Sequence, residues 1–121
     1  MLTVRDVTLD SFQIQASQID TRLVLTLSGT ADMTAYEPMR MCLRQARDDV
    51  AALNLTGVCI DIRSLYLLNS SCIKALVRLV YLAQNEQPRF LLEFLVDHRL
   101  TWQARALAPL QRVAPGLVSV T

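Results

Sequence analysis

The sequence has few of the residues that build common phosphate and metal sites. Its three glycines are isolated from one another, so the chain contains no glycine-rich phosphate loop. The single histidine, His98, has neither a second histidine nor a cysteine at metal-ligand spacing, which argues against a zinc site. The longest apolar stretches are interrupted by Arg or Asp well before they reach the length of a membrane span. We therefore expect no metal, no cofactor and no membrane partner.

An excess of charge of one sign is also missing. The chain has 12 basic and 11 acidic residues, which gives a net charge of +1, and the basic residues are scattered without a basic tract. Electrostatic binding of nucleic acid requires a basic surface, so no nucleic-acid partner is expected. The stripe formed by Arg40, Arg44 and Arg47 is interpreted as a solvated helix face, although Arg40 and Arg44 also suit an acidic partner.

The composition is that of one globular domain spanning residues 1–121. Hydrophobic residues make up 52% and charged residues 19%, and a chain of 121 residues can bury one core. The three cysteines, Cys42, Cys59 and Cys72, are an odd number without paired spacing, which fits no complete disulfide framework. The N-terminus carries acids and no apolar run of signal-peptide length, so we expect a cytoplasmic protein.

Two alternating segments predict an N-terminal hairpin. Apolar and polar residues alternate over 12–17 and again over 23–27, which is the period of strands with one wet face. Asp20-Thr21 is suited to the turn between them, and Gly29 is expected to allow a sharp exit from the second strand.

A long amphipathic helix is predicted next. Apolar residues step by three and four from Tyr36 to Leu53, which corresponds to about five turns. Thr34-x-x-Glu37 has the pattern of a capping box at its start. The adjacent acids Asp48 and Asp49 are expected to be solvated.

The segment from Val58 to Leu82 combines a predicted buried strand, a polar loop and a predicted amphipathic helix. The nearly unbroken apolar run over 58–62 predicts a strand covered on both faces, followed by a short crossing segment. Asn69-Ser70-Ser71 then carries short polar side chains of the kind that cap helices. Helical spacing follows in Ile73, Leu76, Val77 and Val80. The serines therefore lie at a helix N-terminus, where a phosphate is tolerated.

The remaining chain alternates between strand and helix signals. Residues 90–96 predict a third buried strand, and residues 102–107 a short helix capped by Asp97 or Thr101 and broken at Pro109. Residues 117–120 suit a last edge strand. This order predicts an α/β domain: a mixed sheet with parallel central strands, right-handed βα crossovers and an N-terminal hairpin.

The central segment resembles the signature of the STAS domain, the family of bacterial anti-sigma factor antagonists. In that family a strand ends in Asp, an apolar segment follows, and Asp-Ser-Ser-Gly opens a helix. Asp61 matches the strand-end acid, and Asp32 matches an acid that the family carries after an earlier strand. Asn69-Ser70-Ser71-Cys72 matches the tetrapeptide, except that Asn69 replaces the acid and Cys72 the glycine. The resemblance covers roughly residues 20 to 121.

The resemblance implies a regulator that acts by partner switching and is not an enzyme. The unphosphorylated domain would bind an anti-sigma factor or a related serine kinase of the histidine-kinase-like class. That kinase would phosphorylate Ser70, with Ser71 as the second choice, and a metal-dependent serine phosphatase would reset it. The implied partner-binding surface consists of Asp32, Asn69, Ser70, Ser71, Lys74 and Arg78.

Two alternatives remain from the residues themselves. In the first, the domain binds a partner or small ligand constitutively, and Ser70 and Ser71 only cap the helix. In the second, Cys72 serves as a reactive thiol in an enzyme or sensor, because a helix N-terminus can lower the pKa of a thiol.

Overall fold

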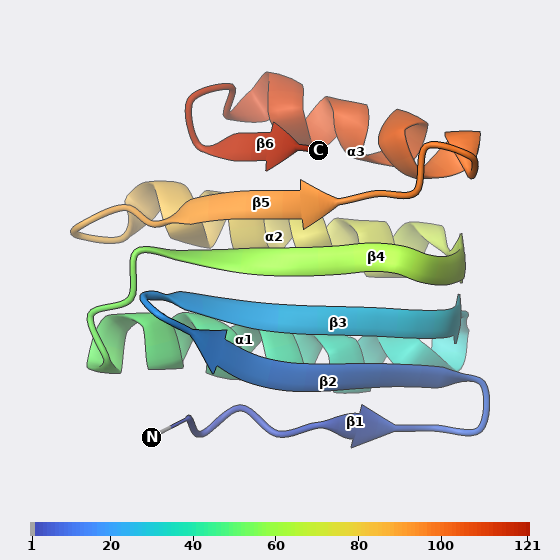
Figure 1. The fold of residues 1–121 in the computed structure, drawn as a ribbon, viewed down its shortest axis with the longest axis horizontal. Coiled ribbons are helices and arrows are strands. Elements are labelled where there is room, and N and C mark those ends of the chain that lie inside the picture. Colours follow the sequence, from blue (N-terminus) through green and yellow to red (C-terminus); the bar gives the residue numbers. More distant parts are fainter. Residues whose placement is uncertain (1) are drawn as a thin grey trace.

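The computed structural model describes residues 2–121 as a mixed six-stranded sheet with its helices on one face (Figure 1). Its strands are β1 (Val7–Thr8), β2 (Phe12–Ile19), β3 (Arg22–Ala31), β4 (Gly57–Leu68), β5 (Leu91–Leu95) and β6 (Val118–Val120). Its helices are the 3-10 turn η1 (Met33–Ala35), α1 (Tyr36–Ala52), α2 (Ser70–Asn85) and α3 (Thr101–Val113).

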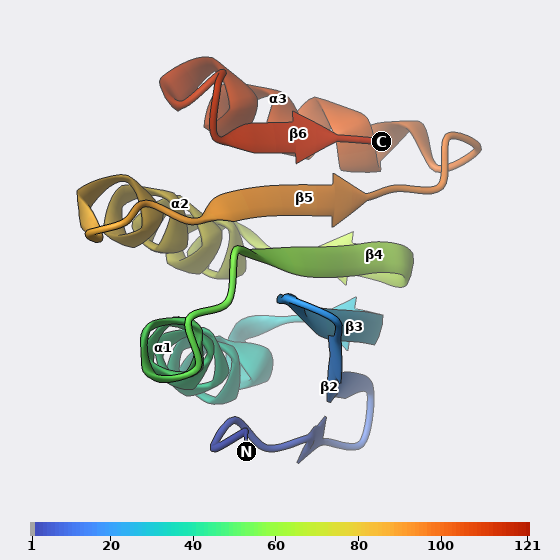
Figure 2. The same ribbon diagram turned by 60° about the vertical axis from the view of Figure 1, so that its left-hand side comes forward.

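The strands follow one another across the sheet in chain order. β1, β2 and β3 pair antiparallel, and β3, β4, β5 and β6 pair parallel. Successive crossovers in one direction place their helices on the same face of a sheet. Accordingly, α1 and α2 lie together behind the strands in Figure 1 and together on one side of the sheet in Figure 2. The predicted mixed sheet, parallel central strands and N-terminal hairpin are confirmed.

The core fills the space between the sheet and its helices. Alternate strand residues point toward the helices because side chains of a strand alternate between its two faces. Their buried side chains include Leu23, Leu25, Leu27, Val58, Ile60, Ile62, Leu92 and Phe94. The apolar stripes of the helices meet them with the buried residues Met39, Leu43, Leu76, Leu79 and Val80.

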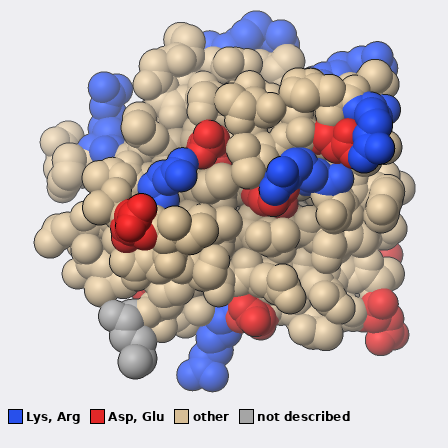
Figure 3. Space-filling model, in the orientation of Figure 1, with Lys and Arg blue, Asp and Glu red and all other residues tan. Residues whose placement is uncertain are grey.

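The opposite face of the sheet carries no helix in the part of the chain that the structure describes (Figures 1 and 2). The buried strand predicted over 58–62 is nevertheless confirmed, because Val58, Cys59, Ile60 and Ile62 are each exposed by 4% or less. On this open face, Cys59 is still only 4% exposed, because it lies beside an ion pair in which Arg22 of β3 reaches Glu93 of β5 across β4 at 2.6 Å. Figure 3 shows the same face, with acidic and basic groups scattered and often adjacent.

Several predicted strand boundaries change because backbone pairing continues past them. The predicted crossing segment after residue 62 is instead a continuation of β4 to Leu68 along β3. Gly29 does not end β3 but lies within it, at an irregularity with φ +89°. A Cβ atom there would lie 2.1 Å from the Ser11 carbonyl oxygen, so this position requires glycine. The short edge strand β1 had no sequence signal.

The predicted caps of two helices are wrong. No side chain of the described residues caps α1, because Asp32 caps the preceding turn η1 instead. At α3 the N-cap is Leu100, and the Asp97 carboxylate accepts the Arg99 N–H at 3.0 Å before the helix begins. Pro109 lies inside α3 rather than ending it. A proline donates no N–H, so the carbonyl of Arg105, four residues earlier, loses its helical partner. Pro109 and Arg105 are both exposed, so water can reach that carbonyl.

Asp49 is buried rather than solvated, with only 1% exposure. Its carboxylate accepts the Thr3 N–H at 2.9 Å, the Thr3 hydroxyl at 2.6 Å and the Val4 N–H at 2.8 Å. Burial by itself raises the pKa of Asp49, but the bonds from Thr3 and Val4 outweigh it and lower the pKa below its ordinary value. Asp49 thereby fastens the N-terminal segment to α1.

Candidate functional site

The ends of β3 and β4 bring two loops together. Ala31 at the end of β3 pairs with Leu68 at the end of β4, and the Asn69 N–H donates to the Ala31 carbonyl at 2.9 Å. The loop that carries Asp32 therefore lies beside the first turn of α2. These are the two segments that the sequence resemblance had indicated.

Asn69 is the N-cap of α2, and the two serines are the first residues inside the helix. Asn69 has an extended backbone (φ −74°, ψ 168°), and its Oδ1 accepts the Cys72 N–H at 3.0 Å. Ser70 is exposed and Ser71 is half-buried. The helix cap predicted within Asn69-Ser70-Ser71 is confirmed and lies at Asn69, whereas the capping role considered for Ser70 and Ser71 is wrong. The Ser70 hydroxyl is therefore not committed to capping.

Asp32 is held in place by Thr34. Its Oδ1 accepts the Thr34 hydroxyl at 2.6 Å and the Thr34 N–H at 2.9 Å. These bonds, the hydroxyl first, lower the pKa of Asp32 below its ordinary value. The carboxylate is thus charged at neutral pH and is fixed near the start of α2.

Cys72 closes the gap between the Asp32 loop and α2. Its side chain is fully buried, and its Sγ lies 3.7 Å from the Asp32 carbonyl oxygen. Burial, and secondly the charge of Asp32, raise the pKa of the Cys72 thiol. A reactive cysteine needs exposure and a lowered pKa, so the geometry does not support the reactive-thiol alternative.

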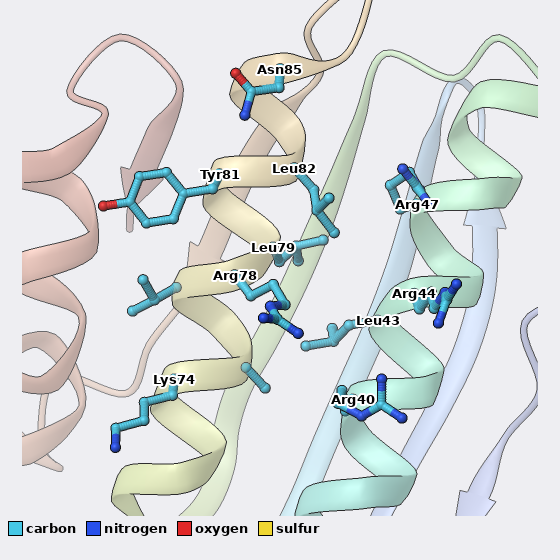
Figure 4. Close-up of a pocket in the computed structure, with 12 residues that line it drawn as sticks. Arg40, Leu43, Arg44, Arg47, Lys74, Arg78, Leu79, Tyr81, Leu82 and Asn85 are labelled. Carbon is cyan, nitrogen blue, oxygen red and sulfur yellow. The ribbon is translucent and has the colours of Figure 1, made fainter.

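Arg78 is separated from the other predicted site residues. Lys74 is exposed one helical turn beyond Ser70. Arg78 lies two turns beyond Ser70, about 12 Å along the helix, and points into the space between α2 and α1 (Figure 4). Asp32, Asn69, Ser70 and Ser71 thus share one end of the domain. Lys74 lies where this end meets a groove along the helical face, and Arg78 lies farther along that groove.

Sequence reasoning missed three exposed apolar side chains in the segments that border Ser70. Met33, directly after Asp32, is 73% exposed; Tyr66 and Leu67, near the end of β4, are 68% and 45% exposed. Methionine and aromatic side chains are enriched at protein interfaces. The exposure of one leucine could have been predicted from the adjacent Leu67 and Leu68, because only one of two consecutive strand residues can face the core.

Gln103 of α3 supports the end of β4 from inside the protein. Pairing between β4 and β5 ends at Asp61, which leaves carbonyl groups of β4 without partners on that side. The fully buried Gln103 donates from Nε2 to Ile62 O at 2.7 Å and to Leu65 O at 2.9 Å. Its Oε1 accepts the Asp97 N–H at 2.7 Å. The strand that leads to Ser70 is therefore anchored on both edges.

Across residues 2–121, no three His, Cys, Asp or Glu side chains are grouped as a metal site would require. Among the helices described, none is both long enough and apolar enough to cross a membrane.

No protein-family model matches this chain, and no curated protein sequence matches it either. Solved structures do. An anti-sigma factor antagonist from Mycobacterium paratuberculosis aligns with a TM-score of 0.64 at 20% identity, over 93% of this chain and 88% of that one. A variant of RsbS from Moorella thermoacetica gives 0.64 at 14% identity, over 88% and 84%. The Bacillus cell fate determinant SpoIIAA in its phosphorylated form gives 0.57 at 15% identity, over 89% and 90%. The chain therefore has the fold of the anti-sigma factor antagonists, as the sequence resemblance predicted.

Proposed function

We propose that this protein is a regulator of the anti-sigma factor antagonist type, which acts by binding a protein partner and is switched by phosphorylation of Ser70. The observation that supports this most is the position of Ser70: exposed, first in α2, released from capping by Asn69 and beside the fixed Asp32 loop. One structure of the same fold is a phosphorylated form of SpoIIAA.

Electrostatics supply the switch. A phosphate adds a charge of about −1.5 to −2 at neutral pH. At the N-terminus of α2 the helix dipole stabilises such a charge by about 0.3–1 kcal/mol, so the fold is retained. A partner that covers Ser70 would have to desolvate the same charge, which disfavours binding. Binding is thereby lost while folding is not.

The partner surface in this proposal combines polar and apolar groups. Asp32, Asn69, Ser71 and Lys74 surround Ser70, and the exposed Met33 and Leu67 supply apolar contact area at the same end. The partner is an anti-sigma factor or related histidine-kinase-like serine kinase, and a metal-dependent serine phosphatase removes the phosphate. The protein itself is not an enzyme in this role, and it acts in the bacterial cytoplasm.

A constitutive binding module is the second candidate, and Asn69 is the observation that favours it. The family that this segment resembles carries an acid there, and a kinase that recognises this acid would not recognise Asn69. The helix cap that Asn69 provides is nevertheless intact. In this case the same end of the domain binds its partner without phosphorylation.

Intact mass and peptide mapping of the protein from its native host test the proposal first. We expect a phosphate on Ser70 under phosphatase inhibition. In pull-downs, Ser70→Ala should retain the partner, and Ser70→Asp should lose it with a melting temperature near that of the wild type. Ser17→Asp is the matched control, because it places the same charge on an exposed serine of β2 outside the proposed surface, and it should retain the partner.

Two results would contradict the switch. One is the absence of phosphate on Ser70 across growth conditions. The other is wild-type partner binding by Ser70→Asp, which would favour the constitutive module.

A further inference from the structure

A groove with a volume of about 580 Å³ runs between α1 and α2, on the side of the domain away from the open sheet face. Its lining is apolar at the floor and cationic at the rim (Figure 4). The apolar lining residues include Leu43, Ala75, Val77, Leu79 and Leu82. The cationic residues are Arg40, Arg44, Arg47, Lys74 and Arg78, and no acidic side chain lines the groove.

The positive charge of this groove is local and only partly neutralised. The whole chain has a net charge of +1, whereas four arginines, Arg40, Arg44, Arg47 and Arg78, gather along this one groove. Lys74 points away from α1 (Figure 4). Arg40 pairs with Glu37 at 3.0 Å, and Arg47 pairs with Asp48 at 3.0 Å and with Glu86, at the end of α2, at 3.6 Å. Within residues 2–121, Arg44 and Arg78 form no ion pair and no side-chain hydrogen bond.

The spacing of the cations suits an extended ligand. Arg40, Arg44 and Arg47 follow one another at i, i+4 and i+7 and span about 10 Å along α1. Arg78 projects from α2 toward Leu43, so its guanidinium faces the arginine row across the groove (Figure 4). Cations that bind a single phosphate converge on one point, whereas these line both sides of a strip.

The floor narrows the chemistry further. The half-buried Val77 and Leu82 leave apolar surface in the groove, and covering that surface with an apolar partner is favourable. The sugar-phosphate chain of a nucleic acid supplies no such cover. Tyr81 points away from α1, toward α3 (Figure 4), so it offers no stacking platform between the two helices. A helix with an apolar face and acids on its flanks satisfies both the floor and the rim.

We infer that the groove between α1 and α2 is a docking site for an acidic amphipathic helix of a partner protein. Leucine-like side chains of that helix cover the floor, and its carboxylates meet Arg44 and Arg78 with further contacts to Arg40 and Arg47. The inference does not rest on the switch proposed at Ser70, because the groove begins one turn beyond that residue and its arginines act without phosphate.

The test uses the full chain and a synthetic fluorescent peptide of about 15 residues, long enough for four helical turns. Its sequence places leucine along one face and glutamate along both flanks. The control peptide has the same composition in scrambled order, which keeps the charge and removes the amphipathic face. Fluorescence anisotropy at physiological salt should show the ordered peptide binding at least tenfold more tightly than the scrambled one.

Charge-reversal variants locate the site. Arg44→Glu and Arg78→Glu should each weaken peptide binding by tenfold or more, and Arg44→Gln and Arg78→Gln by less. Arg112→Glu is the matched control: Arg112 is exposed near the end of α3, outside the groove, and its reversal should leave binding near the wild-type value. Ser70→Asp should also bind the peptide, which separates this inference from the proposed switch. Circular dichroism verifies that each variant is folded.

Three outcomes would overturn the inference. The first is equal binding of the ordered and scrambled peptides. The second is binding of a single-stranded oligonucleotide of the same charge as tightly as the ordered peptide, which would indicate a general anion surface. The third is unchanged peptide binding by folded Arg44→Glu and Arg78→Glu.

Discussion

The Sγ atom of Cys72 lies 3.7 Å from the main-chain oxygen of Asp32 and joins the first turn of α2 to a loop 40 residues earlier in the sequence. Cys72 is fully buried at this contact. In the STAS pattern that this segment resembles, a glycine occupies the position, and a glycine has no side chain to reach the Asp32 loop. The departure at Cys72 thus coincides with a packing contact that helps to hold the candidate site together.

Replacing Cys72 with glycine should lower the free energy of unfolding by about 2 kcal/mol, because the change leaves a cavity and adds backbone freedom to the helix. Cys72→Ala should cost about 1 kcal/mol, since it removes only the sulfur. Urea unfolding measures both. In the native wild type, alkylation of Cys72 should be slow, because its thiol is covered and its pKa is raised. Rapid stoichiometric alkylation would restore the reactive-thiol alternative.

Asn69→Ala should destabilise the protein by about 1 kcal/mol, because the Cys72 N–H loses its cap acceptor. Asn69→Asp is the matched variant, since aspartate also caps and adds a charge that the helix dipole favours. Denaturant midpoints should therefore rank the aspartate variant at or above the wild type and the alanine variant below it. An unchanged midpoint for Asn69→Ala would show that the cap contributes little to stability.

Asp49→Asn should lower the free energy of unfolding by about 2–3 kcal/mol at neutral pH, because an amide cannot accept all the N–H groups of Thr3 and Val4. The effect should depend on pH. The folded-state pKa of Asp49 is below its ordinary value of 3.8, so the charged form stabilises the fold above that value and the benefit is lost as pH falls through the lowered pKa. Unfolding curves for wild type and variant should thus converge below about pH 3.8. A difference that persists unchanged in acid would contradict this account.

Gln103→Met should destabilise the protein by about 3 kcal/mol although it preserves volume, because the buried carbonyls of Ile62 and Leu65 and the part-buried Asp97 N–H lose their partner. Hydrogen exchange of the Asp97 amide should accelerate in this variant, since that amide donates to Gln103 Oε1. Gln111→Met on the exposed side of α3 serves as the control and should change stability little. Comparable stability of the two variants would remove the anchoring role assigned to Gln103.

Local features of the site were predictable because their causes lie within a few residues. Asn69 caps α2 through the Cys72 N–H, three positions away, and the apolar spacing from Ile73 onward specifies the helix that follows. The hairpin turn was likewise predictable, because Asp is one of the residues that tolerate a positive φ, and Asp20 has a φ of 54°.

Contacts between distant segments left no comparable signal. The sequence gives no sign that Asp49 is buried, because the N-terminal segment that covers it is 45 residues away. It gives no sign of the role of Gln103 either, because the β4 carbonyls that it binds are about 40 residues away. The cationic groove has the same origin, because Arg78 lies 34 residues after Arg44 and faces it only when α1 and α2 pack on one face of the sheet.

The sequence by itself determined the order of the strands from β2 to β6 and of the helices α1 to α3, the buried faces of α1 and α2 and the helix start beside Ser70. Hydrophobic period and capping are properties of neighbouring residues, so they act before the chain is packed. Only the tertiary structure decided that one sheet face stays open, that the Asp32 loop meets Cys72 and that arginines from two helices line one groove. These relations depend on which strands pair and on which side each crossover passes, and both follow from packing of the whole domain.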